Sequence, residues 1–177
     1  VLAELHFQPF ELNPHMPAAG QDIGEHLHEK YGSTVEQAAQ VRETIRLRGA
    51  ELGFSFNMQG RSRIYNTFDA HRLLHWARLE GHQLPLKMAL FRAYFSEGEN
   101  PSSHELLIRL AGEVGLDQAR AAEILAGDEF AAEVRAAEEA YQGNGIHAVP
   151  AIIINDRHLL QGGQPVETFE LALRQIA

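Results

Sequence analysis

The sequence predicts an α/β fold in which a small sheet is interrupted by a large all-helical insertion. Strand-like patterns occur near both ends of the 177-residue chain: apolar and polar residues alternate at positions 3–8, and AIIIN at 151–155 is apolar at four consecutive positions. Between them, residues 13–127 show helical spacing and repeated helix-start and helix-stop signals, without a strand pattern. A composition with 45% hydrophobic and 22% charged residues is typical of a globular chain that buries a core.

Charge and composition exclude several classes of protein. The net charge is −9 and the basic residues are scattered, so the basic patch of a nucleic-acid-binding protein is missing. No apolar run approaches the roughly 20 residues of a membrane-spanning helix, and the first ten residues lack the pattern of a signal peptide. Cysteine is absent, which rules out disulfides and thiolate metal sites within these residues and favours a reducing compartment, so we expect a cytoplasmic protein.

The first predicted element is an edge strand in residues 1–12. Apolar side chains at positions 3, 5 and 7 alternate with polar ones, as in a strand with one buried face. Pro9 interrupts this run, and because proline cannot donate a ladder hydrogen bond, the strand is expected at the edge of a sheet.

Residues 13–127 are predicted to form an inserted helical domain. Ser33 with Glu36 has the spacing of a capping box and would begin a helix that stops at Gly53, while Asn66 or Thr67 would cap the next. Further helix starts are indicated by Pro85 at the first helical position, a second capping box of Ser102 with Glu105, and Asp117. Large apolar side chains at helical spacing predict the core: Trp76, Phe91, Tyr94, Phe95, Leu106 and Leu107.

Residues 128–177 combine helix and strand signals. The longest helix is predicted from Asp128 to Gly143, followed by the strand AIIIN, which we expect to be covered on both faces. Asn155 and Asp156 tolerate left-handed conformations and predict a tight hairpin into RHLLQ. Residues 165–176 then form a closing amphipathic helix. The order strand, helical block, long helix, strand, hairpin strand and helix corresponds to the back part of a thioredoxin-like fold with helices inserted in its middle.

Four stretches carry a family resemblance. GIHAVPAIIIND at 145–156 resembles the thioredoxin superfamily, whose members place a cis proline before a central strand. LHFQPFELNP at 5–14, RSRIYNTFDAHRLLHWA at 61–77 and LFRAYFSEGENPS at 90–102 resemble the DsbA-like proteins of FrnE type, which are related to 2-hydroxychromene-2-carboxylate isomerases and kappa-class glutathione transferases. The resemblance extends over the whole chain.

One departure from this family is large. Its members begin with a strand, a Cys-Pro-Trp-Cys type loop and a helix, and nothing corresponding to these stands before Val1. We therefore expect the N-terminal strand and first helix to be missing, and the catalytic cysteine to lie upstream of residue 1. Without that strand both neighbours would expose open edges, so we expect a strand of the same protein or of another copy to fill the place between them. In a homodimer, the second copy of the chain would supply this strand.

The resemblance implies a binding element at Val149 and Pro150. A cis bond there would turn the Val149 backbone groups outward, where an extended peptide or glutathione could pair with them. The alternative is a trans proline that simply begins a strand. His147 would face the catalytic loop and could tune a thiolate or shuttle protons, or it is a solvated loop histidine.

Other candidate residues come from the same resemblance. Asn66, His71 and Arg72 match a stretch that borders the substrate groove in relatives, although a helix cap and surface polar residues explain them equally well. His71 and His75 share a helix face, but without a third ligand we predict no metal site. Gly163 and Gln164 precede the last helix, whose N-terminus suits a carboxylate such as that of glutathione; an ordinary glycine loop is the alternative.

The function that these observations favour is a thiol–disulfide oxidoreductase or isomerase acting on protein or small-molecule disulfides. A glutathione-dependent isomerase or transferase is the first alternative, and a redox-inactive binding domain the second. No bound cofactor is expected, and glutathione is a candidate co-substrate. The expected partner is a disulfide-containing protein or a small thiol.

Overall fold

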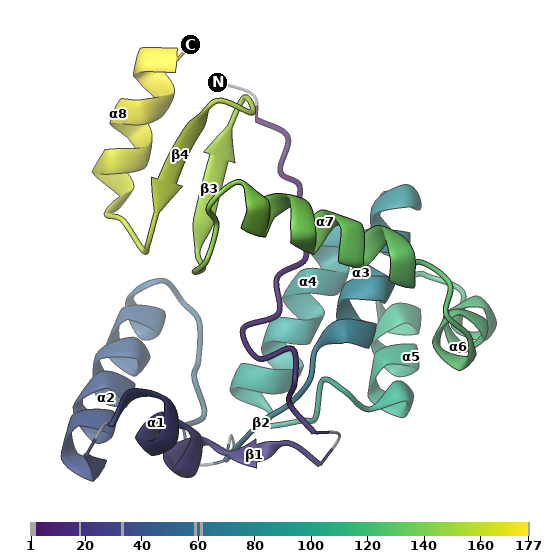
Figure 1. The fold of residues 1–177 in the computed structure, drawn as a ribbon, viewed down its shortest axis with the longest axis horizontal. Helices are drawn as coiled ribbons and strands as arrows, with labels where there is room; N and C mark the ends of the chain where they lie inside the picture. The colour runs from purple at the N-terminus through teal and green to yellow at the C-terminus, as the bar shows by residue number, and fades with distance from the viewer. Residues whose placement is uncertain (1–2, 18, 33, 59, 61, 177) are drawn as a thin grey trace.

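Helices dominate the computed structural model, which describes residues 3–17, 19–32, 34–58, 60 and 62–176. A short strand β1 (Gln21–Asp22) leads into α1 (Ile23–Tyr31) and α2 (Val35–Glu51), and β2 (Arg63–Ile64) leads into the main helical block. That block comprises α3 (Phe68–Leu79), α4 (Gln83–Phe91), a π-helical turn (Arg92–Ser96), α5 (His104–Glu113), α6 (Gln118–Ala126) and α7 (Ala131–Gly143). The chain closes with β3 (Ala151–Ile154), β4 (His158–Gln161) and α8 (Val166–Ile176) (Figure 1).

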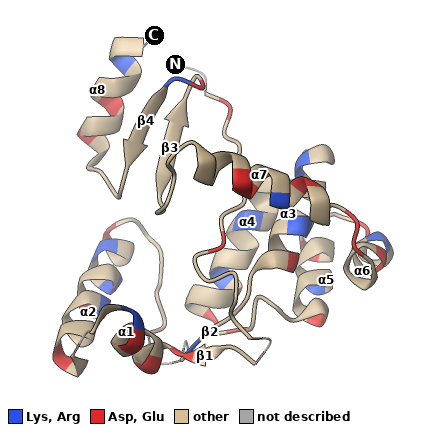
Figure 2. Ribbon diagram, viewed as in Figure 1, with Lys and Arg blue, Asp and Glu red and all other residues tan. Residues whose placement is uncertain are grey.

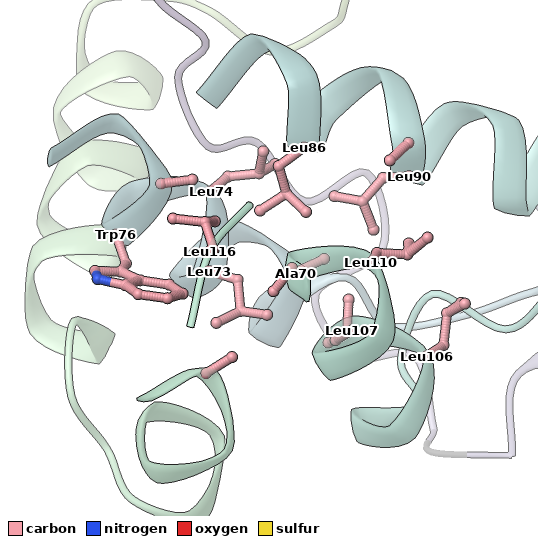
Figure 3. Close-up of a cluster of buried hydrophobic side chains, with 14 of the residues drawn as sticks. Ala70, Leu73, Leu74, Trp76, Leu86, Leu90, Leu106, Leu107, Leu110 and Leu116 are labelled. Carbon is pink, nitrogen blue, oxygen red and sulfur yellow. The ribbon is translucent and has the colours of Figure 1, made fainter. Parts of the chain in front are cut away.

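The hydrophobic core lies among helices α3 to α6. Leu73, Leu86, Leu107 and Leu110 are fully buried, and they come from three different helices that pack side by side (Figure 3). The predicted core residues Trp76, Leu106 and Leu107 are confirmed as buried. The other three predicted core residues are aromatic and only partly buried, and their rings pack edge to face against one another: Phe91, Tyr94 and Phe95.

The predicted edge strand is wrong for the described residues 3–12, which form no strand. A strand requires a neighbour to complete its ladder, and this segment finds a side chain instead. The Phe7 N–H donates to Gln83 Oε1 at 2.9 Å, and Gln83 Nε2 donates to the Phe7 carbonyl at 2.8 Å. The amide of Gln83 thus takes the place of one residue of a partner strand and fixes the segment to α4.

The inserted block is not purely helical, which corrects the prediction for residues 13–127. Strands β1 and β2 pair antiparallel, with Gln21 opposite Ile64 and Asp22 opposite Arg63. Two residues are too few to produce an alternating pattern in the sequence. Gly20 precedes β1 with φ +69°, and a Cβ there would lie 2.4 Å from the Ile64 carbonyl oxygen, so glycine is required for the close approach.

The helix caps in both predicted capping boxes are displaced by one residue, and a capping box forms only at the first of them. Thr34 caps α2, accepting from Gln37 N at 3.2 Å while its own N–H donates to Gln37 Oε1 at 3.0 Å; Ser33 lies outside the described residues. Ser103 caps α5 instead of Ser102. The Ser102 hydroxyl donates to Asn100 Oδ1 at 2.7 Å, which directs its side chain toward Asn100.

The remaining helix starts agree with the sequence to different degrees. Asp117 caps α6 as predicted, accepting from the N–H groups of Ala119 and Arg120. The helix predicted from Asp128 begins three residues later, at Ala131, because Phe130 adopts a left-handed conformation with φ 62°. Pro85 lies at the third position of α4 and not the first.

The C-terminal hairpin forms as predicted at its turn. Asn155 and Asp156 have φ of 52° and 54°, and Arg157 N–H donates to the Ile154 carbonyl at 3.2 Å. The sequence also predicts that the strand AIIIN is covered on both faces. This prediction is wrong for β3, because Ile153 is 41% exposed. Within the described ranges no strand other than β4 pairs with β3.

Charges are distributed over the helices with both signs interspersed, whereas β3 and β4 carry none (Figure 2). None of the helices in the described ranges is long and apolar enough to cross a membrane.

Candidate functional site

The loop after α7 is anchored by one buried residue and is exposed beyond it. Ile146 is buried, and its N–H donates to the Tyr141 carbonyl at 3.0 Å, which ends the helix. His147, Val149 and Pro150 then lie on the surface. The Val149–Pro150 peptide bond is cis. No hydrogen bond joins the Val149 backbone to another described residue, so both of its polar groups are free to bind a partner.

A second loop lies against this one. The Gly162 N–H donates to the Pro150 carbonyl at 2.9 Å, which brings residues 162–164 next to the exposed Val149 and Pro150. Gly163 is exposed, and Gln164 Nε2 donates to the Gln161 carbonyl at 2.7 Å. Four of the predicted site residues are therefore brought together at one end of the hairpin: Val149, Pro150, Gly163 and Gln164.

The outer edge of β3 is open in the described part of the molecule. The register pairs Ile152 with Leu160, and residue 150 is bonded to residue 162. Hydrogen-bonded and non-hydrogen-bonded pairs alternate along an antiparallel ladder, so the backbone groups of Ala151 and Ile153 face away from β4. In the view of Figure 1 the N-terminal segment passes on this side of β3 without pairing with it. The edge can therefore accept a strand.

Arg72 does not belong to this site, which corrects the sequence prediction. The side chain is buried, with 3% of the residue exposed. Its guanidinium donates to Asp69 Oδ1 at 2.8 Å and to the carbonyls of Glu129 and Gly127 at 2.9 and 2.7 Å, and also to the Ile124 carbonyl. Arg72 thus satisfies the carbonyl groups at the end of α6 and is a structural residue.

Asn66 has a role in fixing the N-terminal segment. Its Oδ1 accepts from Phe68 N–H at 2.9 Å, and its Nδ2 donates to Glu11 Oε1 at 3.1 Å. Both hydrogen-bonding ends of the amide are used within the protein. Asn66 lies one residue before Thr67, the N-cap of α3, and it therefore supports the start of this helix and tethers the N-terminal segment.

His71 lies away from the proline loop and lines a cavity between α3, α4, α7 and residues 7–9. Burial, together with the positive charges of Lys87 and Arg135, lowers the pKa of His71 to about 3, against the opposing effect of a hydrogen bond with the Phe10 backbone. The imidazole is thus neutral at physiological pH. His75 packs its ring against Phe130, with the centroids 5.1 Å apart.

An ionic cluster of two buried carboxylates and the partly exposed Arg135 joins the N-terminal segment to α7. Glu11 and Glu138 are 5% and 4% exposed, and both bind Nη1 of Arg135, which also lies over the Phe68 ring at 3.8 Å. Burial and the neighbouring Glu11 raise the pKa of Glu138, and its Oε1 has no hydrogen-bond partner among the described residues. This cluster holds the segment that carries Phe7 against the helices.

Sequence reasoning missed the residues that fix the N-terminal segment: Glu11, Gln83, Arg135 and Glu138. Glu11 and Arg135 are 124 positions apart, so no local spacing could have linked them.

Comparison with known proteins places this arrangement in a family. The family model described as DSBA-like thioredoxin domain matches residues 2–174. The uncharacterized protein YwbO of Bacillus subtilis is 28% identical over 173 residues, which cover 96% of this chain and 80% of that protein.

Solved structures of other proteins share the fold. The probable DsbA oxidoreductase SCO1869 from Streptomyces coelicolor superposes with a TM-score of 0.85 at 32% identity, covering 94% of this chain and 72% of that one. A 2-hydroxychromene-2-carboxylate isomerase superposes with a TM-score of 0.65 at 15% identity, covering 91% of this chain and 78% of that one, and shows the likeness of fold alone. With its proline loop, hairpin and inserted helices, the chain belongs to the DSBA-like thioredoxin domain family.

Proposed function

We propose that the protein exchanges disulfides with a protein or small-molecule partner held as an extended strand against Val149 and Pro150. The attacking cysteine is carried by a segment that pairs with the open edge of β3 and comes from the same protein or from a second copy. The single observation that carries this proposal is that edge, where the backbone groups of Ala151 and Ile153 face away from β4 beside the exposed proline loop.

The surface around β3 supports the proposal. Val149 and Ile153, two apolar residues at and next to β3, are 44% and 41% exposed. Neither strand of the hairpin carries a charge (Figure 2). Open strand edges are usually protected by charged residues, by proline or by a covering element, because they otherwise invite aggregation. A strand and helix that cover this surface would remove the hazard.

The chemistry assigned to the added segment is ordinary thiol–disulfide exchange. Its cysteine thiolate attacks one sulfur of the partner's disulfide, a mixed disulfide forms, and the other sulfur leaves as a thiolate. A second cysteine in the segment resolves the mixed disulfide and is itself oxidised. A helix N-terminus next to the first cysteine would lower its pKa and favour the thiolate. Residues 147–150 contribute binding and positioning and no electrons.

The proposal is tested by insulin reduction in the presence of dithiothreitol. The 177 residues contain no thiol, so alone they are expected to give no turnover above the buffer background. The same residues joined to a strand, a Cys-x-x-Cys loop and a helix are expected to reduce insulin, because the nucleophile then lies beside the proline loop. The matched control carries Ser-x-x-Ser in that loop.

Turnover by the 177 residues alone would contradict the proposal, and so would an inactive protein whose Cys-x-x-Cys segment is shown to be folded on β3. If the natural segment that pairs with β3 carries a lone serine, a glutathione-dependent isomerase replaces this proposal. If it carries neither cysteine nor serine, the domain acts by binding alone.

A further inference from the structure

A cavity of about 190 Å³ lies between the N-terminal segment, α3, α4 and α7, apart from the proline loop. None of the residues that line it belongs to the loops at 144–150 or 162–164. Its walls mix apolar and ionisable side chains, from Phe7, Gln8, Pro9, His71, Leu74, His75, Arg78, Gln83, Lys87, Glu133 and Ala137.

Lys87 is the unusual residue of this cavity. Its side chain is partly buried, and its ammonium lies 4.8 Å from the centroid of the Phe91 ring and 5.8 Å from that of Phe7. Within the described ranges, neither a carboxylate nor any other hydrogen-bond acceptor contacts Nζ. The aromatic faces stabilise the positive charge, but they leave the donor groups of the ammonium unused. Burial lowers the pKa of Lys87.

The other ionisable groups of the cavity do not compensate the charge of Lys87. His71 is neutral at physiological pH, and burial also lowers the pKa of His75, so neither histidine adds a lasting charge. Arg78 is exposed at the rim, and Glu133 of α7 is the one acidic residue among the lining residues. The lining thus carries two cations, Lys87 and Arg78, and one carboxylate, that of Glu133. A single further negative charge would balance the charges of the cavity.

We propose that this cavity binds a small monoanionic carboxylate whose charge pairs with the Lys87 ammonium. The apolar body of the ligand would contact Phe7, Leu74 and Ala137, which line the same space. The volume lies below the roughly 300–1,000 Å³ of sites for drug-sized ligands, so the ligand is a small organic acid. A doubly charged phosphate is disfavoured, because its second charge would face Glu133 without another buried cation.

Benzoate and its neutral isostere benzamide provide the test, with chemical-shift titration as the measurement. Benzoate is expected to shift the resonances of Phe7, His71 and Leu74 saturably, and benzamide is not. Lys87→Met is expected to weaken benzoate binding about 10- to 100-fold, the usual range for losing a charge-assisted hydrogen bond, whereas Lys87→Arg retains binding. Lys30→Met removes the other lysine, which is exposed and bound to Leu12 and Asn13, and should leave binding unchanged.

A second measurement does not depend on the folding of a variant. Because the sequence has two lysines, acetylation of wild-type protein by a limiting amine-reactive reagent reports on each separately. Benzoate is expected to slow acetylation of Lys87 and leave Lys30 unaffected. Equal binding of benzoate and benzamide, unaltered benzoate binding by folded Lys87→Met, or no protection of Lys87 would each overturn the proposal.

Discussion

Replacing Arg72 with methionine is expected to lower the free energy of unfolding by about 3–5 kcal/mol. The guanidinium is buried and donates to three backbone carbonyls as well as to Asp69. Methionine fills a similar volume but donates no hydrogen bond, so the carbonyls of Ile124 and Gly127 lose a donor in a place that water does not readily reach. Chemical denaturation followed by far-ultraviolet circular dichroism measures the change.

The matched control is Arg174→Met on α8. Arg174 is 72% exposed in its side chain and pairs with Glu170 one helical turn away. Exposed pairs of this kind contribute about 0.3–0.5 kcal/mol, so the control should remain near the wild type. If Arg72→Met also stays within 1 kcal/mol of the wild type, the buried hydrogen bonds of Arg72 do not hold α6 as we infer.

Lowering the pH from 7 to 5 is expected to cost about 2 kcal/mol of stability through His71 alone. The pKa of this histidine is about 3 in the folded protein against a reference value of 6.5. Between these values the unfolded chain binds a proton that the folded protein does not, so stability falls as the pH drops below about 6.5. The cause is burial first, followed by the nearby charges of Lys87 and Arg135.

His71→Gln should remove this loss, because glutamine does not titrate. The comparison is made as a difference between variant and wild type in urea unfolding at pH 7 and pH 5. Glu138 acts in the opposite direction, because its raised pKa stabilises the protein as the pH falls. Both proteins carry Glu138, so its effect cancels when the stability change of the variant is subtracted from that of the wild type. The matched control is His158→Gln, the same exchange at an exposed histidine of β4. An equal loss of stability in His71→Gln and wild type would contradict the assignment.

Local chemistry in the sequence was sufficient to predict several elements. Asn155 and Asp156 defined the hairpin turn, and Asp117 defined the start of α6, because each acts through residues within three positions of itself. The predicted strand at residues 3–12, in contrast, depended on a partner that is distant in the sequence, and it was wrong. Alternation shows that a segment can form a strand, but the strand exists only where another strand lies beside it, and Gln83 took that place.

The candidate site shows the same difference between residues with local partners and residues with distant ones. Val149 and Pro150 were identified from a contiguous stretch, and Gly163 and Gln164 join them through one hydrogen bond from Gly162 to Pro150. Arg72 was misassigned because its partners Ile124, Gly127 and Glu129 lie more than 50 positions away. A charged residue next to a recognised stretch gives no sign in the sequence of whether it faces solvent or a buried helix end.

Amide hydrogen exchange at Ala151 and Ile153 tests most directly whether the outer edge of β3 is open, on which the proposed function depends. In the 177-residue chain these two amides should exchange faster than that of Ile152, whose N–H faces β4. In a protein that also carries the strand, Cys-x-x-Cys loop and helix, both should become as protected as Ile152. Equal protection of all three amides in the shorter chain, or continued fast exchange of Ala151 and Ile153 in the longer one, would contradict the account.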